Sequence, residues 1–270
     1  MRTIRWIKTP IFLLALLLFT VVSYGENTPT SDAVFLTHMR TLSESRGLVW
    51  RAYKNHIMLG LKNPYKNPSE RLRESIALFE KSIDTTYTYT KEENLSKTLP
   101  FLDQALQEWH MLKTLLLDAP SPAQVARIDA LSMKVTRTII KALKAMGSYD
   151  PSGNWKYLEQ IQKAQNIAQR MGTLYLDNVW GGLSAKRYDK MMTKVTGNYT
   201  KVENLIYKSR FLTPQIEDTL QHAHKDYFYF EMMWKSGKHA RIPTLIYQKS
   251  SDMDQKLGHC TTLIMQALTK

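Results

Sequence analysis

Apolar residues recur along the chain at alternating intervals of three and four positions, the spacing that places side chains on one face of an α-helix. Polar and charged residues fill the positions between them, so each segment has one face suited to burial and one suited to water. Two clear apolar stripes consist of Leu72, Ile76, Phe79 and Ile83, and of Leu102, Ala105, Trp109, Leu112 and Leu116.

Prolines mark where several of these helices begin, because proline fits the first turn of a helix without the loss of a hydrogen bond. Helical segments follow Pro68, Pro100, Pro122, Pro214 and Pro243. The pattern predicts eight helices, at residues 32–62, 69–88, 100–118, 122–147, 154–183, 185–210, 214–236 and 243–268. The β-branched and aromatic stretch at 85–90 has no second strand-like run to pair with, so it predicts a frayed helix end and a loop.

Helices with a single apolar stripe need other helices to cover it, and short connections make successive helices antiparallel neighbours. The sequence therefore predicts an all-α protein of up-down four-helix bundles. The halves of the chain also match each other: Leu72, Ile76 and Ile83 fall on Met191, Val195 and Val202 at an offset of 119 residues. We interpret this period as two tandem four-helix repeats, 31–147 and 154–268, joined by a turn-rich linker.

The first predicted helix carries an arginine where a hydrophobic residue is expected. Arg46 lies in the stripe formed by Met39, Leu42, Val49 and Tyr53. Burial of an unpaired guanidinium is unfavourable, so Arg46 pairs with a carboxylate, extends to the surface, or meets an anionic ligand or a second subunit. In the second repeat Gln165 takes the equivalent place, in a stripe with Ile161, Ala168, Gly172 and Tyr175.

The first 25 residues have the features of a secretory signal peptide. Arg2, Arg5 and Lys8 precede an apolar run of 12 residues, and the small-residue site at 23–25 follows it. The run is shorter than the roughly 17 to 25 residues that span a bilayer, so a retained N-terminal membrane anchor is the less favoured alternative. We expect cleavage near Gly25 and export to the periplasm.

Composition and motifs argue against an enzyme. Walker A, G-x-G-x-x-G, H-E-x-x-H and G-x-S-x-G motifs do not occur in the sequence. Cys260, the single cysteine, excludes an internal disulfide and a cysteine-based metal site, and we expect it to be a small core residue. His222 and His224 point roughly 200° apart on a helix and cannot share a metal ion. We therefore expect no catalytic residues, no cofactor and no metal.

The net charge favours negatively charged partners. The full chain carries +13, and loss of the three basic residues of the signal peptide leaves +10. An exported protein without a nucleic-acid-binding motif is not expected to bind nucleic acid. Small anions, anionic lipid head groups and envelope polysaccharides remain as candidate partners, and so does a basic surface that only keeps the protein in solution.

Three segments resemble a known family. Residues 45–51 read SRGLVWR, residues 74–80 read ESIALFE, and residues 165–171 read QNIAQRM. Together they resemble the N-terminal periplasmic domain of PilJ-type methyl-accepting chemotaxis transducers of type IV pili and of NarX-type nitrate sensors, whose first helix carries an R-M-x-S-x-R box. The third segment resembles a second copy of the box in which glutamine replaces the first arginine.

The resemblance implies a site and a mode of action. The first arginine of the box binds nitrate at a dimer interface in the nitrate sensors, which assigns an anion-binding role to Arg46 and makes Arg51 the second box arginine. Gln165 and Arg170 are the weaker equivalents in the second repeat. Family members continue into a membrane helix and a signalling module, whereas this chain ends at Lys270. We therefore expect signalling to need a separate membrane partner.

Two functions of different classes follow. The first is an exported sensor-like protein that binds a small, nitrate-like anion through Arg46, with or without Arg51, as a monomer or a homodimer. The second is a structural or adaptor protein of the cell envelope in which Arg46 is a paired core charge and no small ligand exists. A pocket at Arg46 that lacks any carboxylate partner would favour the first function. A salt bridge of Arg46, or an exposed apolar patch elsewhere, would favour the second.

Overall fold

A computed structural model describes residues 31–235 and 242–269, and all regular elements in these ranges are helical. The predicted signal peptide at 1–25 and the predicted last residue of the seventh helix, at 236, lie outside the described residues. In chain order the elements are α2 (Ser31–Gly60), α3 (Pro68–Glu92), α4 (Leu99–Leu117), a short 3-10 turn (Pro122–Gln124), α5 (Val125–Gly147), α6 (Trp155–Trp180), α7 (Ala185–Tyr207), α8 (Pro214–Lys235) and α9 (Pro243–Leu268). The prediction of an all-α protein with eight α-helices is confirmed for the described residues.

Proline and serine residues account for where several of the helices begin. Proline occupies the first turn of α3, α4 and α9, as the sequence predicted. At Pro122 the chain first makes a 3-10 turn, in which the Ser121 hydroxyl accepts a hydrogen bond from the Ala123 amide, before α5 begins at Val125. Both apolar stripes named above are buried throughout, and so is Cys260.

The expectation of a frayed helix end and loop at 85–90 is wrong. Helix α3 continues to Glu92, and Thr86, Tyr89 and Thr90 are buried within it. The Tyr89 ring stacks on His38 of α2 with 3.9 Å between ring centroids, and the Thr86 hydroxyl donates to the Ser82 carbonyl. Packing against α2 thus overrides the weak helix propensity of these β-branched and aromatic residues.

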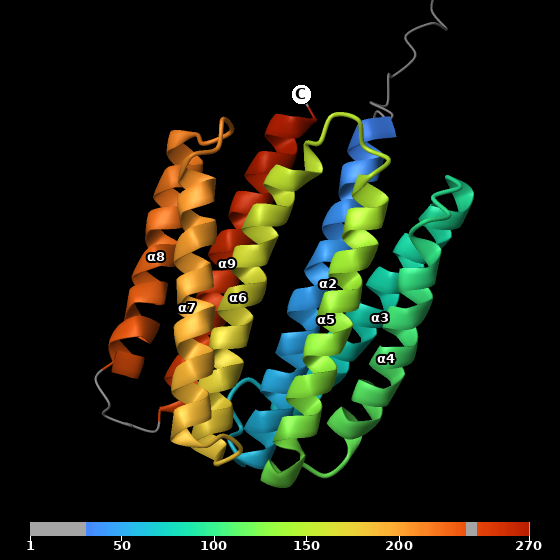
Figure 1. Ribbon diagram of the computed structural model, residues 1–270. Helices are drawn as coiled ribbons and strands as arrows, with labels where there is room; N and C mark the ends of the chain where they lie inside the picture. The colour runs from blue at the N-terminus through green and yellow to red at the C-terminus, as the bar shows by residue number, and fades with distance from the viewer. Residues whose placement is uncertain (1–30, 236–241, 270) are drawn as a thin grey trace, which may run out of the picture.

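The same set of helix pairings occurs in both halves of the chain. Helix α2 packs against α3 and α5, and α4 packs against α5; likewise α6 packs against α7 and α9, and α8 packs against α9. Figure 1 shows all eight helices side by side, with α2 to α5 on one side and α6 to α9 on the other. The buried apolar side chains of both groups form one continuous cluster.

Helices α2 and α6, the first of each predicted repeat, join the two groups. Contacts between α2 and α6 follow the same residue order on both helices. Gln162 donates to the Arg40 carbonyl and Thr173 to the Trp50 carbonyl. Further along, the Tyr53 hydroxyl donates to Asp177. The two helices therefore run in the same direction. No helix within 31–235 or 242–269 combines the length and apolarity that a membrane crossing requires.

Helix α6 approaches α9 closely at Gly172. A Cβ atom added there would lie 2.6 Å from the Ser250 hydroxyl oxygen and 2.7 Å from the Ser250 Cβ. At Gly197, on the exposed face of α7, the same added Cβ would have no described atom within 4 Å apart from its chain neighbours and the nearby backbone of α7. The chain thus offers two helical glycines that differ only in their surroundings.

We expect Gly172→Ala to lower the free energy of unfolding by about 1–3 kcal/mol, because the methyl group overpacks the α6–α9 contact. Gly197→Ala is the matched control and should raise it by about 0.5–1 kcal/mol through helix propensity alone. Urea unfolding followed by circular dichroism measures both values. Equal effects of the two substitutions would contradict the close approach at Gly172.

Candidate functional site

The four residues singled out from the sequence lie in two pockets on opposite sides of the α2–α6 pair. Arg46 and Arg170 line the first pocket, which we call the cationic pocket and which lies between α2, α5, α6 and α7. Arg51 and Gln165 line the second pocket, which lies between α2, α3, α6 and α9. Arg46 and Arg51 therefore do not share a site, although one helix carries both.

The cationic pocket has a volume of about 330 Å³. Its lining, among the residues that the structure describes, contains several basic side chains and a single acidic one. The basic side chains are Arg46, Arg137, Lys144, Lys163 and Arg170, and the acidic one is Glu159.

Arg46 is almost fully buried and is held in place by its own helix and by α6. Its Nε donates to the Ser43 carbonyl over 3.2 Å and its Nη2 to the Ser43 hydroxyl over 2.5 Å. Its Nη1 donates to Oε1 of Glu159, a partly exposed carboxylate, over 3.2 Å. Burial lowers the pKa of Arg46 and Glu159 opposes this shift, so the ion pair compensates part of the unfavourable desolvation.

Arg170 has no comparable partner in the ranges that the structure describes. Its guanidinium carbon lies 5.1 Å from the centroid of the Trp50 ring, and its Nε is buried without a hydrogen bond to any described residue. Burial lowers the pKa of Arg170; Asp129 acts against this shift, and the charge of Arg137 adds to it. The ring contact supplies a modest attraction, but the positive charge has no ion pair among the described residues.

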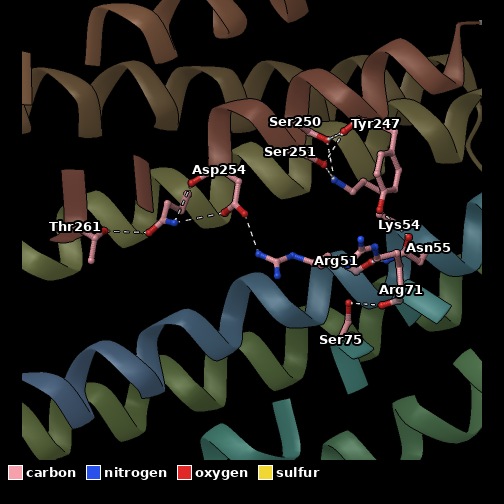
Figure 2. A network of polar contacts seen from close by, with 11 residues as sticks. Arg51, Lys54, Asn55, Arg71, Ser75, Tyr247, Ser250, Ser251, Asp254 and Thr261 are labelled. Atoms are coloured by element: carbon pink, nitrogen blue, oxygen red, sulfur yellow. Dashed lines mark hydrogen bonds and ion pairs between the residues drawn. The ribbon is translucent and has the colours of Figure 1, made fainter. Parts of the chain in front are cut away.

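Arg51, the arginine of the second pocket, forms an ion pair with an acidic residue. Arg51 donates to Oδ2 of Asp254 on α9 over 2.8 Å, and the volume of this pocket is only about 180 Å³. Gln165 donates to the Asp254 carbonyl over 3.1 Å and accepts a hydrogen bond from Thr261 over 3.1 Å. Asp254 therefore links Arg51 to Gln165. Figure 2 shows Arg51 and Asp254 pointing toward each other.

The two pockets correspond to each other in the repeat. Arg46 matches Gln165 and Arg51 matches Arg170 at an offset of 119 residues. At the offset of 121 that relates Pro122 to Pro243, Asp254 matches Met133, which lines the cationic pocket. A carboxylate thus occupies one pocket at the position where the other pocket has a thioether, and Arg170 has no ion pair within the described part of the chain.

A buried lysine lies beside the second pocket. Lys54 of α2 donates to the hydroxyls of Ser250 and Ser251 over 2.8 and 3.2 Å, and its Nζ lies 4.4 Å from the centroid of the Tyr247 ring (Figure 2). Burial lowers the pKa of Lys54 to about 7, and nearby Asp254 only partly opposes this effect. Hydroxyls and an aromatic ring thus hold this ammonium group, with no carboxylate in ion-pair contact among the described residues.

Sequence reasoning found Arg46 and Arg170 but missed the rest of the cationic pocket. Arg137 and Lys144 are seven residues apart on α5, as are Lys163 and Arg170 on α6. Seven residues make nearly two helical turns, so each pair shares a face, and this spacing was a usable signal. Which helices would face each other could not be read from the spacing. The role of Asp254 could be foreseen only by comparison of the last predicted helix of each half, at 122–147 and 243–268.

The histidines of α8 do not form a metal site with their neighbours. His222 lies 3.6 Å from Asp218 on the same helix, and the ring Nδ1 of His224 contacts the Glu203 carboxylate at 2.9 Å. Within the part of the chain that the structure describes, no group of three histidine, cysteine or acidic side chains is arranged to hold a metal ion.

Comparison of the chain with protein-family models, with curated proteins and with solved structures finds no match. The geometry of the two pockets is therefore the basis for any functional conclusion.

The buried ammonium group predicts a specific dependence of stability on pH. The unfolded chain binds a proton at Lys54 up to its ordinary pKa of 10.5, whereas the folded chain releases it above about 7. Between these values unfolding takes up protons, so the stability of the wild type rises with pH relative to Lys54→Met, by about 1 kcal/mol per pH unit. Below pH 7 both states are protonated and the difference is constant.

Urea unfolding of wild type and Lys54→Met at pH 6, 7.5 and 9 measures this difference. Lys201→Met, at an exposed position of α7, serves as the control and should keep the pH dependence of the wild type. A difference between wild type and Lys54→Met that does not change with pH would show that the ammonium group is solvated.

Proposed function

We propose that this protein is an exported, non-enzymatic binding protein that holds a small anion in the cationic pocket and acts through a separate membrane partner. The observation that carries the proposal is the unpaired Arg170. Its counterpart Arg51 is neutralised by Asp254 inside the protein, whereas Arg170 faces a pocket lined by four further basic residues and one carboxylate. An anion in this pocket would supply the charge that Asp254 supplies in the other.

The geometry also gives an anion suitable donors. Arginine offers planar, charge-assisted hydrogen bonds that match carboxylate, nitrate and phosphate groups. Arg46 is held rigidly by Ser43 and Glu159, so little side-chain entropy is lost when a ligand binds there. The low solvent exposure of Arg46 and Trp50 strengthens electrostatic attraction, because water screens it less than at the surface.

Sequence features support the remaining parts of the proposal. The resemblance of residues 45–51 and 165–171 to the box of PilJ-type transducers and NarX-type nitrate sensors supports a sensor-like role in which Arg46 contacts the anion. The N-terminal segment supports export to the periplasm. Coupling to a membrane-bound signalling protein, and a homodimer, rest on the same resemblance.

The experiment is thermal unfolding of the protein against nitrate, phosphate, sulfate, formate and acetate at constant ionic strength. An anion present at 100 times its Kd should stabilise the wild type by about 2.7 kcal/mol. Arg170→Gln should abolish this shift, because the unpaired guanidinium is lost. Arg51→Gln is the matched control and should keep the shift, since Arg51 lies in the other pocket. An unchanged shift in Arg170→Gln, or none in the wild type, would overturn the proposal.

The ion pair of Arg46 with Glu159 favours a second candidate, an envelope adaptor without a small ligand. In that case the charge of Arg46 is already satisfied within the core, and the pair contributes to the packing of α2 on α6. The two candidate functions assign different roles to Glu159. It competes with the ligand in a binding protein and only supports the fold in an adaptor.

We therefore expect Glu159→Gln to bind the anion about three- to tenfold more tightly than the wild type, because a competing negative charge leaves the pocket. Titration calorimetry measures the affinity, and Glu93→Gln, at an exposed position after α3, controls for the change in net charge. A loss of about 1–3 kcal/mol in unfolding free energy without any anion binding would favour the adaptor.

A further inference from the structure

The cationic pocket is larger than a nitrate-sized anion requires. A water molecule occupies about 30 Å³ in the liquid, so about 330 Å³ corresponds to roughly ten water molecules. This volume falls at the lower end of the range that accommodates organic ligands. A three-oxygen anion would fill only a small part of it.

The pocket is also elongated along the helix axes. Its lining follows α5 from Met133 to Lys144 and α6 from Trp155 to Arg170. At 1.5 Å per residue, these spans correspond to about 16 and 22 Å. Because Gly147 at the end of α5 lies against the ring of Trp155 at the start of α6, the two helices line the pocket in opposite directions.

The basic residues gather toward two ends of this elongated space. Arg137 and Arg170 are close enough for the charge of Arg137 to act on Arg170. Lys163 lies seven residues before Arg170 on α6 and Lys144 seven residues after Arg137 on α5, so both lysines lie about 10 Å further toward the Trp155 end. The buried guanidinium of Arg46, paired with Glu159, belongs to the lysine end.

Apolar side chains line the space between these ends. Ile140 and Leu143 lie between Arg137 and Lys144 on α5, and Ile167 lies between Lys163 and Arg170 on α6. Trp50 adds an aromatic surface at the Arg170 end. A compact inorganic ion would leave these groups without contacts, and a polyphosphate would place charged oxygens against them. An apolar linker between two acidic groups fits both the charged ends and the apolar middle.

We infer that the ligand of this pocket is a linear organic dianion, with one acidic group at Arg137 and Arg170 and the other at Lys144, Lys163 and Arg46. The inference rests on the proposed function, since it names the chemical class of the anion bound at the same site. Recognition at both ends makes affinity depend on the length of the linker, which a single-ended anion site would not do.

Unbranched α,ω-dicarboxylates of four to twelve carbons test this inference, beside monocarboxylates of the same lengths at constant ionic strength. Titration calorimetry should find one optimal length at which the dicarboxylate binds at least tenfold more tightly than the matching monocarboxylate. Lys163→Gln should reduce this preference to about twofold or less. Lys141→Gln removes an exposed charge from α5 outside the pocket and should leave the preference unchanged.

The outcomes distinguish failure of the dianion inference from failure of the proposed anion-binding function. If monovalent anions bind and Arg170→Gln abolishes this binding, but dicarboxylates bind within twofold of monocarboxylates at every length, the proposed function stands and the dianion is rejected. If Lys163→Gln keeps the full preference, the second end of the site is rejected. If no anion binds to the wild type, both the dianion and the proposed function are rejected.

Discussion

Parallel packing of α2 against α6 is the contact on which the rest of the structure depends. These two helices carry polar residues within their apolar stripes, and each packs against two further helices of its own half. Because they run in the same direction, equivalent positions of the two halves lie on opposite sides of the contact. Arg46 of one half is therefore brought into the same pocket as Arg170 of the other, and Arg51 into the same pocket as Gln165.

The central helices carry two buried cations, Arg46 and Lys54, and a partly buried one, Arg170, and each is accommodated in a different way. Among the described residues, Arg46 has a carboxylate and a serine as partners, Lys54 has two hydroxyls and an aromatic ring, and Arg170 has an aromatic ring as its direct contact. Burial lowers the pKa of all three groups, and Glu159, Asp254 and Asp129 respectively oppose this shift. Such groups lower stability unless they are compensated, and the least compensated of them lines the larger pocket.

Much of the fold could be predicted from the sequence, because helical periodicity and proline positions are local signals. Residues 85–90 were misjudged because their helical state depends on the contact of Tyr89 with His38, which no local pattern reveals. The odd residue in the first stripe led to Arg46, and the repeat led to Arg170. The partners of these residues could not be predicted, because Glu159 and Asp254 reach them only through packing between distant helices. The residues of each half were therefore easier to foresee than the contacts between the halves.

The exchange of a thioether for a carboxylate at the position shared by Met133 and Asp254 makes the two sides of the molecule chemically unequal. The carboxylate belongs to α9, so on this side the arginine already has its ion pair. Asp254 also links α9 to α2 and α6. Under the proposed function, one anion would bind per chain rather than one on each side. An anion in the cationic pocket would contact α2, α5, α6 and α7, so its effect would fall on one side of a molecule whose two halves share the same helix pairings.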